Sequence, residues 1–219
     1  KCYGGADYDV LTCLIKSDNG NLLLGGYSKS YIGGNKTEHA KGLNDYWIIK
    51  IDSIGNIIWQ NTIGGSQEDF LFSAFRTSDN GFVLGGNSNS SITTDKTENK
   101  IGLQDFWIVK VDSMGNVQWQ NTIGGTKDEK IGDVIQTSNG EYVVAGKTVS
   151  ETGGDRQSIN YGSDIWLLFL DTVGIIVDQK IICANKDDGE SYICCYQELP
   201  NCKLVESNDG GLFLGTSTR

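Results

Sequence analysis

The stretch DYWIIKIDSIGNIIWQNTIGG, from Asp45 to Gly65, returns sixty residues later as DFWIVKVDSMGNVQWQNTIGG, from Asp105 to Gly125. Extended by four residues toward the N-terminus, the two copies agree at 17 of 25 positions. A more divergent third copy, SDIWLLFLDTVGIIVDQKII, begins at Ser163, and a fourth begins near Ala184. Chance does not produce agreement at this level, so the chain is built from tandem units of about sixty residues.

Each unit divides into four short strand candidates separated by turn signals. In the second unit the expected strands are Phe70–Thr77, Phe82–Asn87, Asp105–Val111 and Val117–Ile123. Four antiparallel strands repeated in tandem are typical of a β-propeller blade. The sequence therefore predicts an all-β fold, a partial β-propeller over residues 1–219 with blades at 4–63, 64–123 and 124–183 and an incomplete blade at 184–219. Because these units leave the ring incomplete, we expect other segments of a longer chain to close the propeller.

The composition supports strands and tight turns and excludes some classes of partner. Of 219 residues, 29 are glycine and only one is proline, with nine tyrosines and five tryptophans. The formal charge is −10, which repels phosphate backbones and anionic membrane surfaces, so nucleic acid is excluded as an expected partner. The chain contains no apolar run of the roughly 18–20 residues that a membrane helix needs, and we expect no membrane insertion.

The residues that recur in each unit have structural roles on physical grounds. A tryptophan on the third strand can bury its ring between neighbouring blades. Glycine doublets on the second strand permit close backbone approach, and glycines in the turns adopt positive φ at little cost. An aspartate two residues before the tryptophan can accept backbone N–H bonds and tie a loop to its strand. These sets are Trp47, Trp107 and Trp166; Gly25–Gly26 and Gly85–Gly86; Gly55, Gly115 and Gly174; and Asp45, Asp105 and Asp164.

The order of these motifs is similar to the kelch repeat. An apolar run with a glycine doublet, LLLGG at Leu22–Gly26, precedes Asp-x-Trp at Asp45–Trp47 and a second tryptophan, Trp59, twelve residues further on. The chain more closely resembles a family of tandem repeats in secreted and surface proteins of Bacteroidetes, which Thr62–Gln120 matches almost throughout, including SNSSITTDKTE at Ser88–Glu98. The resemblance covers nearly the whole chain except residues 183–202.

This resemblance implies a propeller, a secreted or outer cell-surface location, and export by type IX secretion. It implies no catalytic residues. We therefore expect a non-enzymatic binding or adhesion module for an envelope protein or a glycan. The alternative is an accessory propeller domain of a larger secreted hydrolase or other enzyme.

Repeated polar loops are the first candidate binding site. NKTEHAKG at Asn35–Gly42 and DKTENKIG at Asp95–Gly102 recur on the same face of successive blades. Such loops can grip a glycan or protein at several points at once, or they can simply be solvated. The candidate binding residues are Lys36, Glu38, Lys96 and Glu98.

A second candidate site is the turn between the third and fourth strands. There the triplets DSI, DSM and DTV match the pattern of Asp, Ser or Thr, then an apolar residue, which resembles the O-glycosylation motif of Bacteroidetes. Asp-Ser also makes a good turn without any sugar, and both interpretations stay open. The candidate attachment residues are Ser53, Ser113 and Thr172.

Six cysteines lie near the two ends of the chain, and no CxxC pair occurs among them. Their even number favours disulfides in an oxidising compartment, with buried free thiols as the alternative. Three of them fall in an insert at 183–202 that is either a disulfide-tied excursion or a specialised contact surface. The candidates are Cys2, Cys13, Cys183, Cys194, Cys195 and Cys202.

Residues for catalysis or metal binding are largely missing from the sequence. The single histidine, His39, lies in a polar loop where the next unit has Asn99, and it is expected to be a surface residue. We find no metal-binding motif, phosphate-binding loop or calcium-loop spacing. The sequence therefore predicts no enzyme activity, no cofactor and no metal.

Overall fold

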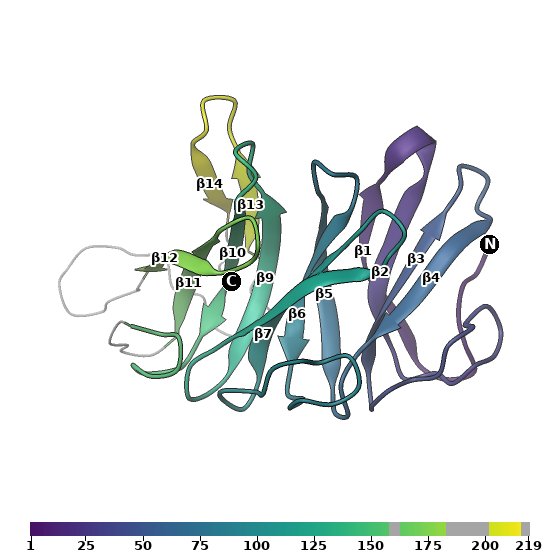
Figure 1. Ribbon diagram of the computed structural model, residues 1–219, viewed down its shortest axis with the longest axis horizontal. Coiled ribbons are helices and arrows are strands. Elements are labelled where there is room, and N and C mark those ends of the chain that lie inside the picture. The colour runs from purple at the N-terminus through teal and green to yellow at the C-terminus, as the bar shows by residue number, and fades with distance from the viewer. Residues whose placement is uncertain (158–162, 183–201, 216–219) are drawn as a thin grey trace.

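Three four-stranded antiparallel sheets and one strand pair follow one another in sequence order. The computed structural model of the chain describes residues 1–157, 163–182 and 202–215. In Figure 1 the sheets stand side by side, with the N-terminal sheet on the right and the C-terminal pair, β13–β14, toward the left. Each sheet pairs its strands in the order in which the chain reaches them. The prediction of an all-β fold is thus confirmed.

The strands recur with nearly the same lengths in each unit. The first sheet holds β1 (Asp9–Lys16), β2 (Leu22–Ser28), β3 (Asp45–Ile51) and β4 (Ile57–Ile63), with a short 3-10 turn, η1 (Asp18–Gly20), between β1 and β2. The second holds β5 (Asp69–Arg76), β6 (Phe82–Ser88), β7 (Asp105–Val111) and β8 (Val117–Ile123). The third holds β9 (Glu129–Gln136), β10 (Tyr142–Thr148), β11 (Asp164–Leu170) and β12 (Ile176–Ile182), and the pair is β13 (Lys203–Glu206) and β14 (Leu212–Gly215).

The strands predicted in the second unit agree closely with the observed ones. The third and fourth have the predicted bounds, while the first begins and ends one residue earlier and the second ends one residue later. The turn glycines Gly55, Gly115 and Gly174 have φ of 81°, 85° and 87°, in the left-handed region that favours glycine.

Apolar cores lie between successive sheets. Leu23, Tyr46 and Ile48 of the first sheet pack on Leu71 and its neighbours in the second, and the second and third sheets repeat this arrangement. A smaller core joins the third sheet to the C-terminal pair. Each fully buried Leu, Ile or Val side chain contributes about 1.5–3 kcal/mol, so these cores hold the sheets together.

Each first strand has one extra residue opposite its partner strand. The register shifts at Thr12, at Phe72 and again at Gly132. At the first of these bulges the Thr12 hydroxyl donates to the carbonyl of Leu71 at 2.8 Å, which links β1 to β5 across the junction. A bulge bends its strand and redirects the neighbouring side chains. Within the described ranges, no helix has the length and apolarity needed to cross a membrane.

Candidate functional site: the loop face

The long loops between second and third strands lie at one end of the sheets, and the tight turns lie at the other (Figure 1). We call the end with the long loops the loop face. Its loops span residues 29–44 and 89–104, with a third beginning at residue 149. Each contains a tight turn closed by a pair of backbone hydrogen bonds, such as those between Gly33 and Lys36. This turn sets the direction of a cationic side chain.

The cationic side chain at that turn points inward in all three units. Lys36 and Lys96 are each only 1% exposed, and their ammonium groups lie 5.2 and 4.9 Å from the ring centres of Trp47 and Trp107. Each ammonium also donates to a threonine hydroxyl on the fourth strand, Thr62 or Thr122. A cation over an indole face is stabilised by the ring quadrupole. Both ammonium groups are therefore turned away from the surface and anchor the loop, and a ligand contact by these lysines stays a prediction.

The third unit keeps the anchor with different chemistry. Arg156 is 1% exposed, donates to the Thr148 hydroxyl at 2.9 Å and pairs with Asp164 at 3.1 Å. Its counterparts Asp45 and Asp105 accept backbone N–H bonds from their loops, as predicted. A cation considered by itself among polar neighbours looks solvated in a sequence. Its recurrence at sixty-residue spacing was the signal that could have identified it.

A glutamine on the fourth strand links each loop to its tryptophan. Gln60 accepts from the Trp47 indole N–H at 3.1 Å and donates its amide to the Asn35 carbonyl at 2.7 Å. The same pair of bonds recurs through Gln120 and through Gln179. A buried indole N–H needs an acceptor, and this relay supplies it while holding the loop turn.

The predicted binding residues Glu38 and Glu98 also make internal contacts. The Glu38 carboxylate accepts from the backbone N–H of Thr62 at 2.6 Å, and Glu98 does the same for Thr122 at 2.5 Å. Both carboxylates therefore satisfy a donor on the outer strand of their sheet. They are half-buried and fix the loop in place.

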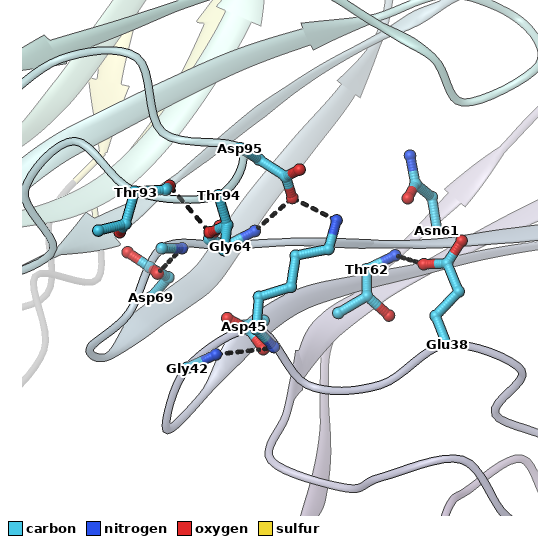
Figure 2. Close-up of polar contacts among 12 residues, drawn as sticks. Glu38, Gly42, Asp45, Asn61, Thr62, Gly64, Asp69, Thr93, Thr94 and Asp95 are labelled. Atoms are coloured by element: carbon cyan, nitrogen blue, oxygen red, sulfur yellow. Dashed lines mark hydrogen bonds and ion pairs between the residues drawn. The ribbon is translucent and has the colours of Figure 1, made fainter.

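Adjacent loops are joined at the junction of the first two sheets (Figure 2). Asp95 of the second loop accepts from the Gly64 N–H at 3.1 Å and forms an ion pair with Lys41 of the first loop. The Thr94 hydroxyl donates to the Gly64 carbonyl at 2.6 Å. A Cβ at Gly64 would lie 1.8 Å from Asp45 Oδ1, so only glycine fits there. This packing explains the first of the two glycines in the TIGG phrase.

Burial shifts the pKa values of the charged groups at this junction. Removal from water raises the pKa of the Asp45 carboxyl to about 6, and the nearby Asp69 adds to the shift. The pKa of Asp69 is itself raised for the same main reason. Burial lowers the pKa of the Lys96 ammonium to about 8, although three carboxylates oppose the shift. Removal from water is thus the main influence on all three ionisable groups at this junction.

Apolar side chains are exposed on the loops between these anchors. Ile32 and Ile92 are 52% and 55% exposed at equivalent positions, and Leu43 and Leu103 are 55% and 60% exposed. Tyr31 is also exposed, with its ring 5.9 Å from that of His39, a surface residue as predicted. Exposed apolar groups that recur on one face are typical of interaction surfaces.

The turns at the other end hold the candidate glycosylation residues. Asp52 accepts from the N–H groups of Ile54 and Asn56 at 3.0 and 2.7 Å, which closes the turn around Ser53. Ser53 and Thr172 are exposed. Ser113 is half-buried, and its carbonyl accepts from the indole N–H of Trp59 at 3.1 Å. The turn interpretation has direct geometric support, and sugar attachment stays a prediction.

Two of the candidate disulfide cysteines are free thiols. Cys2 is exposed at the N-terminus, and Cys13 lies with its sulfur against Gly25. Burial raises the pKa of the Cys13 thiol to about 11, so it behaves as a small apolar residue. Neither residue forms a disulfide within the part of the chain that the structure describes, and Cys13 packs at the junction with the second sheet. Cys202 is buried beside Leu204, and Cys183, Cys194 and Cys195 lie outside the described residues with the rest of the insert.

Comparisons with known proteins identify no relative. No family model matches the sequence, and a search of curated proteins found no significant match. In the part of the chain that the structure describes, no group of three or more His, Cys, Asp or Glu side chains is arranged to hold a metal ion. The resemblance to Bacteroidetes repeat proteins stays a prediction from the sequence.

Proposed function

We propose that the chain is a non-enzymatic binding module of the secreted or cell-surface type, built as part of a β-propeller. Support for the propeller comes from the tandem four-stranded sheets, in which each first strand packs on the preceding sheet. The proposed ligand is a protein or glycan of the cell envelope, as the resemblance to Bacteroidetes surface repeats suggests.

The loop face carries this proposal. Its anchoring residues point inward and bond to other parts of the protein. Apolar side chains are exposed at equivalent positions of two loops: Ile32, Leu43, Ile92 and Leu103. A ligand that spans two loops would contact equivalent apolar side chains on both of them. Two simultaneous contacts raise the affinity without any new type of contact. The anchors keep the loops in one geometry, so little conformational entropy is lost on binding.

A binding experiment with matched variants tests the proposal. Purified protein is applied to a glycan array and to solubilised native membranes, and bound material is quantified. The double variant Ile92→Asp with Leu103→Asp is expected to lose at least about tenfold in captured ligand, since each buried methylene contributes about 0.8 kcal/mol. The control, Ile54→Asp with Met114→Asp, changes exposed apolar residues at the opposite end and keeps binding. Equal loss in both variants, or no ligand in either screen, contradicts the proposal.

We also propose that Ser53, Ser113 and Thr172 carry O-glycans in the native protein. Support comes from the recurrence of the triplet at three turns and from the exposure of Ser53 and Thr172. The proteolytic peptides that contain these three residues, prepared from protein of the native source, are expected to exceed the masses of the unmodified peptides. Masses equal to those of the unmodified peptides would exclude the modification.

A further inference from the structure

At the junction of the first and second sheets, a carboxylate binds a lysine of the neighbouring loop. The Lys41 ammonium forms an ion pair with Asp95, whose carboxylate also accepts from the Gly64 N–H at 3.1 Å (Figure 2). The Asp95 N–H donates in turn to the Gly64 carbonyl at 3.3 Å. The carboxylate therefore has two kinds of partner here, a backbone N–H and a primary ammonium.

The junction of the second and third sheets keeps this carboxylate in the same backbone setting. Asp155 follows Asp95 by sixty residues and accepts from the Gly124 N–H, again at 3.1 Å. Its own N–H donates to the Gly124 carbonyl at 2.9 Å. Within the part of the chain that the structure describes, however, no ion pair includes Asp155. The second junction thus has the carboxylate without the ammonium.

The lysine that supplies the ammonium in the first junction has an apolar counterpart in the second. The residue sixty positions after Lys41 is Ile101, and a Cβ at Gly154 would lie 2.6 Å from its side chain. Ile101 therefore packs on the backbone of the third loop and offers no donor. Lys100, the next residue toward the N-terminus, is exposed, and its charge acts on Asp105.

Asp155 lines a pocket of about 360 Å³ that the second and third units form together. Glu98 supplies a second carboxylate, and Asn121 supplies an amide whose nitrogen already donates to a backbone carbonyl. The lining also includes Val173 and Ile175, which are 57% and 61% exposed. Carboxylates bind ammonium groups strongly, and apolar side chains favour the methylenes of an alkyl chain. The lining therefore suits an alkylammonium.

The charges that act on Asp155 are negative. Burial raises the pKa of its carboxyl, and the charges of Asp105 and Glu98 raise it further. Lys96 is near enough to interact with Glu98, but its ammonium is buried over an indole ring. The equivalent lysine and glutamate of the first unit interact in the same way, although another lysine binds beside them. A cation at Asp155 would offset the repulsion among these carboxylates.

We propose that this pocket binds a primary ammonium on an alkyl chain, the group that ends a lysine side chain of a protein partner. The ammonium donates to Asp155 as Lys41 donates to Asp95, and the methylenes lie against Val173 and Ile175. The first junction supports this because the same fold binds an ammonium there. The proposal goes beyond the proposed function, which depends on the apolar side chains of the loop face.

Titration with Nα-acetyl-lysine amide tests the pocket. The readout is the backbone amide NMR signals of Gly124, bonded to Asp155, and of Gly64, bonded to Asp95. We expect the Gly124 signal to shift and the Gly64 signal to stay, because Lys41 already occupies Asp95. The same compound acetylated on its side-chain nitrogen has no charge and should bind at least about tenfold more weakly. Equal responses to the two compounds, or equal shifts of the two signals, would contradict the proposal.

Two reciprocal substitutions serve as matched variants. Ile101→Lys supplies an internal ammonium at the second junction and should weaken binding of the lysine compound at least about tenfold. Lys41→Ile removes the ammonium from the first junction and should make the Gly64 signal respond as the Gly124 signal does. Both positions are partly exposed, so both variants are expected to fold, and the NMR spectrum itself checks this. An unchanged titration in folded Ile101→Lys would show that the proposal is wrong.

A metal ion is the other ligand that paired carboxylates attract. Calcium chloride, added at constant ionic strength, is expected to leave the Gly124 signal in place, since only two carboxylates line the pocket. A shift with calcium and none with the lysine compound would identify a metal site and overturn the proposal. These readouts are separate from ligand capture by the loop face, so either proposal can fail alone.

Discussion

The two internal junctions share their apolar contacts and some polar bonds, and differ in other polar bonds. Between the first and second sheets, the Tyr46 hydroxyl donates to the Trp107 carbonyl at 2.9 Å, and Tyr27 packs edge-on against Phe70. Between the second and third sheets, Phe106 has no hydroxyl, and the Asn87 amide bonds the backbone of β9 instead. Likewise, the cation that anchors the long loop is a lysine in the first two units and Arg156 in the third. The apolar pattern therefore defines the junction, and several polar solutions fit around it.

The largest effect is expected from the apolar part that both junctions share. Leu71→Ala and Ile131→Ala should each lower the free energy of unfolding by about 2–5 kcal/mol, since both side chains are buried in cores. Leu11→Ala, at the equivalent position of the first sheet, where the side chain is 62% exposed, should cost less than about 1 kcal/mol. Urea unfolding measures all three, and a similar cost at Leu11 would show that this side chain is buried in solution.

The pH dependence of stability probes the charged part of the first junction. The pKa of the Asp45 carboxyl rises from 3.8 to about 6 on folding, so the folded chain binds more protons than the unfolded chain between these values. Stability therefore falls as the pH rises through that window, by up to about 3 kcal/mol. Urea unfolding at pH 4 and pH 7 should show this fall in the native chain and a smaller one in Asp45→Asn. An unchanged pH dependence in the variant would assign the effect to other groups.

The next largest effect on stability is expected from the Asn87 side-chain amide, at the junction between the second and third sheets. Asn87 donates to the Glu129 carbonyl at 2.6 Å and accepts from the Ile131 N–H at 3.0 Å. Asn87→Ala leaves both backbone groups without this partner at a buried site and should cost about 1–3 kcal/mol in the free energy of unfolding. Asn35→Ala, at an exposed position on the loop of the first unit, serves as the matched substitution. Equal costs for the two would show that the bridge to β9 contributes nothing.

The smallest effect is expected from the hydroxyl that distinguishes the first junction. Tyr46→Phe recreates the residue found at position 106 and removes one hydrogen bond to a backbone carbonyl. The expected cost is about 1 kcal/mol in the free energy of unfolding. Thermal and urea unfolding can both detect it. A cost above about 3 kcal/mol would mean that the junctions depend on their polar contacts more than we infer.

Much of the architecture was predictable because the residues that determine it recur in each repeat unit. Strand alternation, turn glycines and the tryptophan positions follow from local chemistry that repeats every unit, and the bounds of β7 and β8 were predicted without error. The aspartates Asp45 and Asp105 were also assigned the loop-tying role that they have.

The functional assignments were less predictable because they depend on side-chain direction. Lys36 and Lys96 were predicted to face a ligand, and a lysine in a polar loop gives no local sign that it folds back over an indole. Cys13 was predicted to form a disulfide, whereas its equivalents Ser73 and Asp133 show that the position faces the next sheet and accepts varied side chains. Both facts depend on contacts between residues far apart in sequence.

The inward anchors separate the residues that fold a loop from those that face outward. Lys36, Glu38 and Gln60 hold the first loop, and their equivalents hold the second with the same bonds. Between these anchors the sequence already differs, with Tyr31 replaced by Ser91 and His39 by Asn99 in the next unit. Substitutions at such exposed positions are expected to leave stability nearly unchanged, so the outward residues of each unit can diverge independently. Selection for a new ligand can then act on one loop at a time while the rest of the protein keeps its fold.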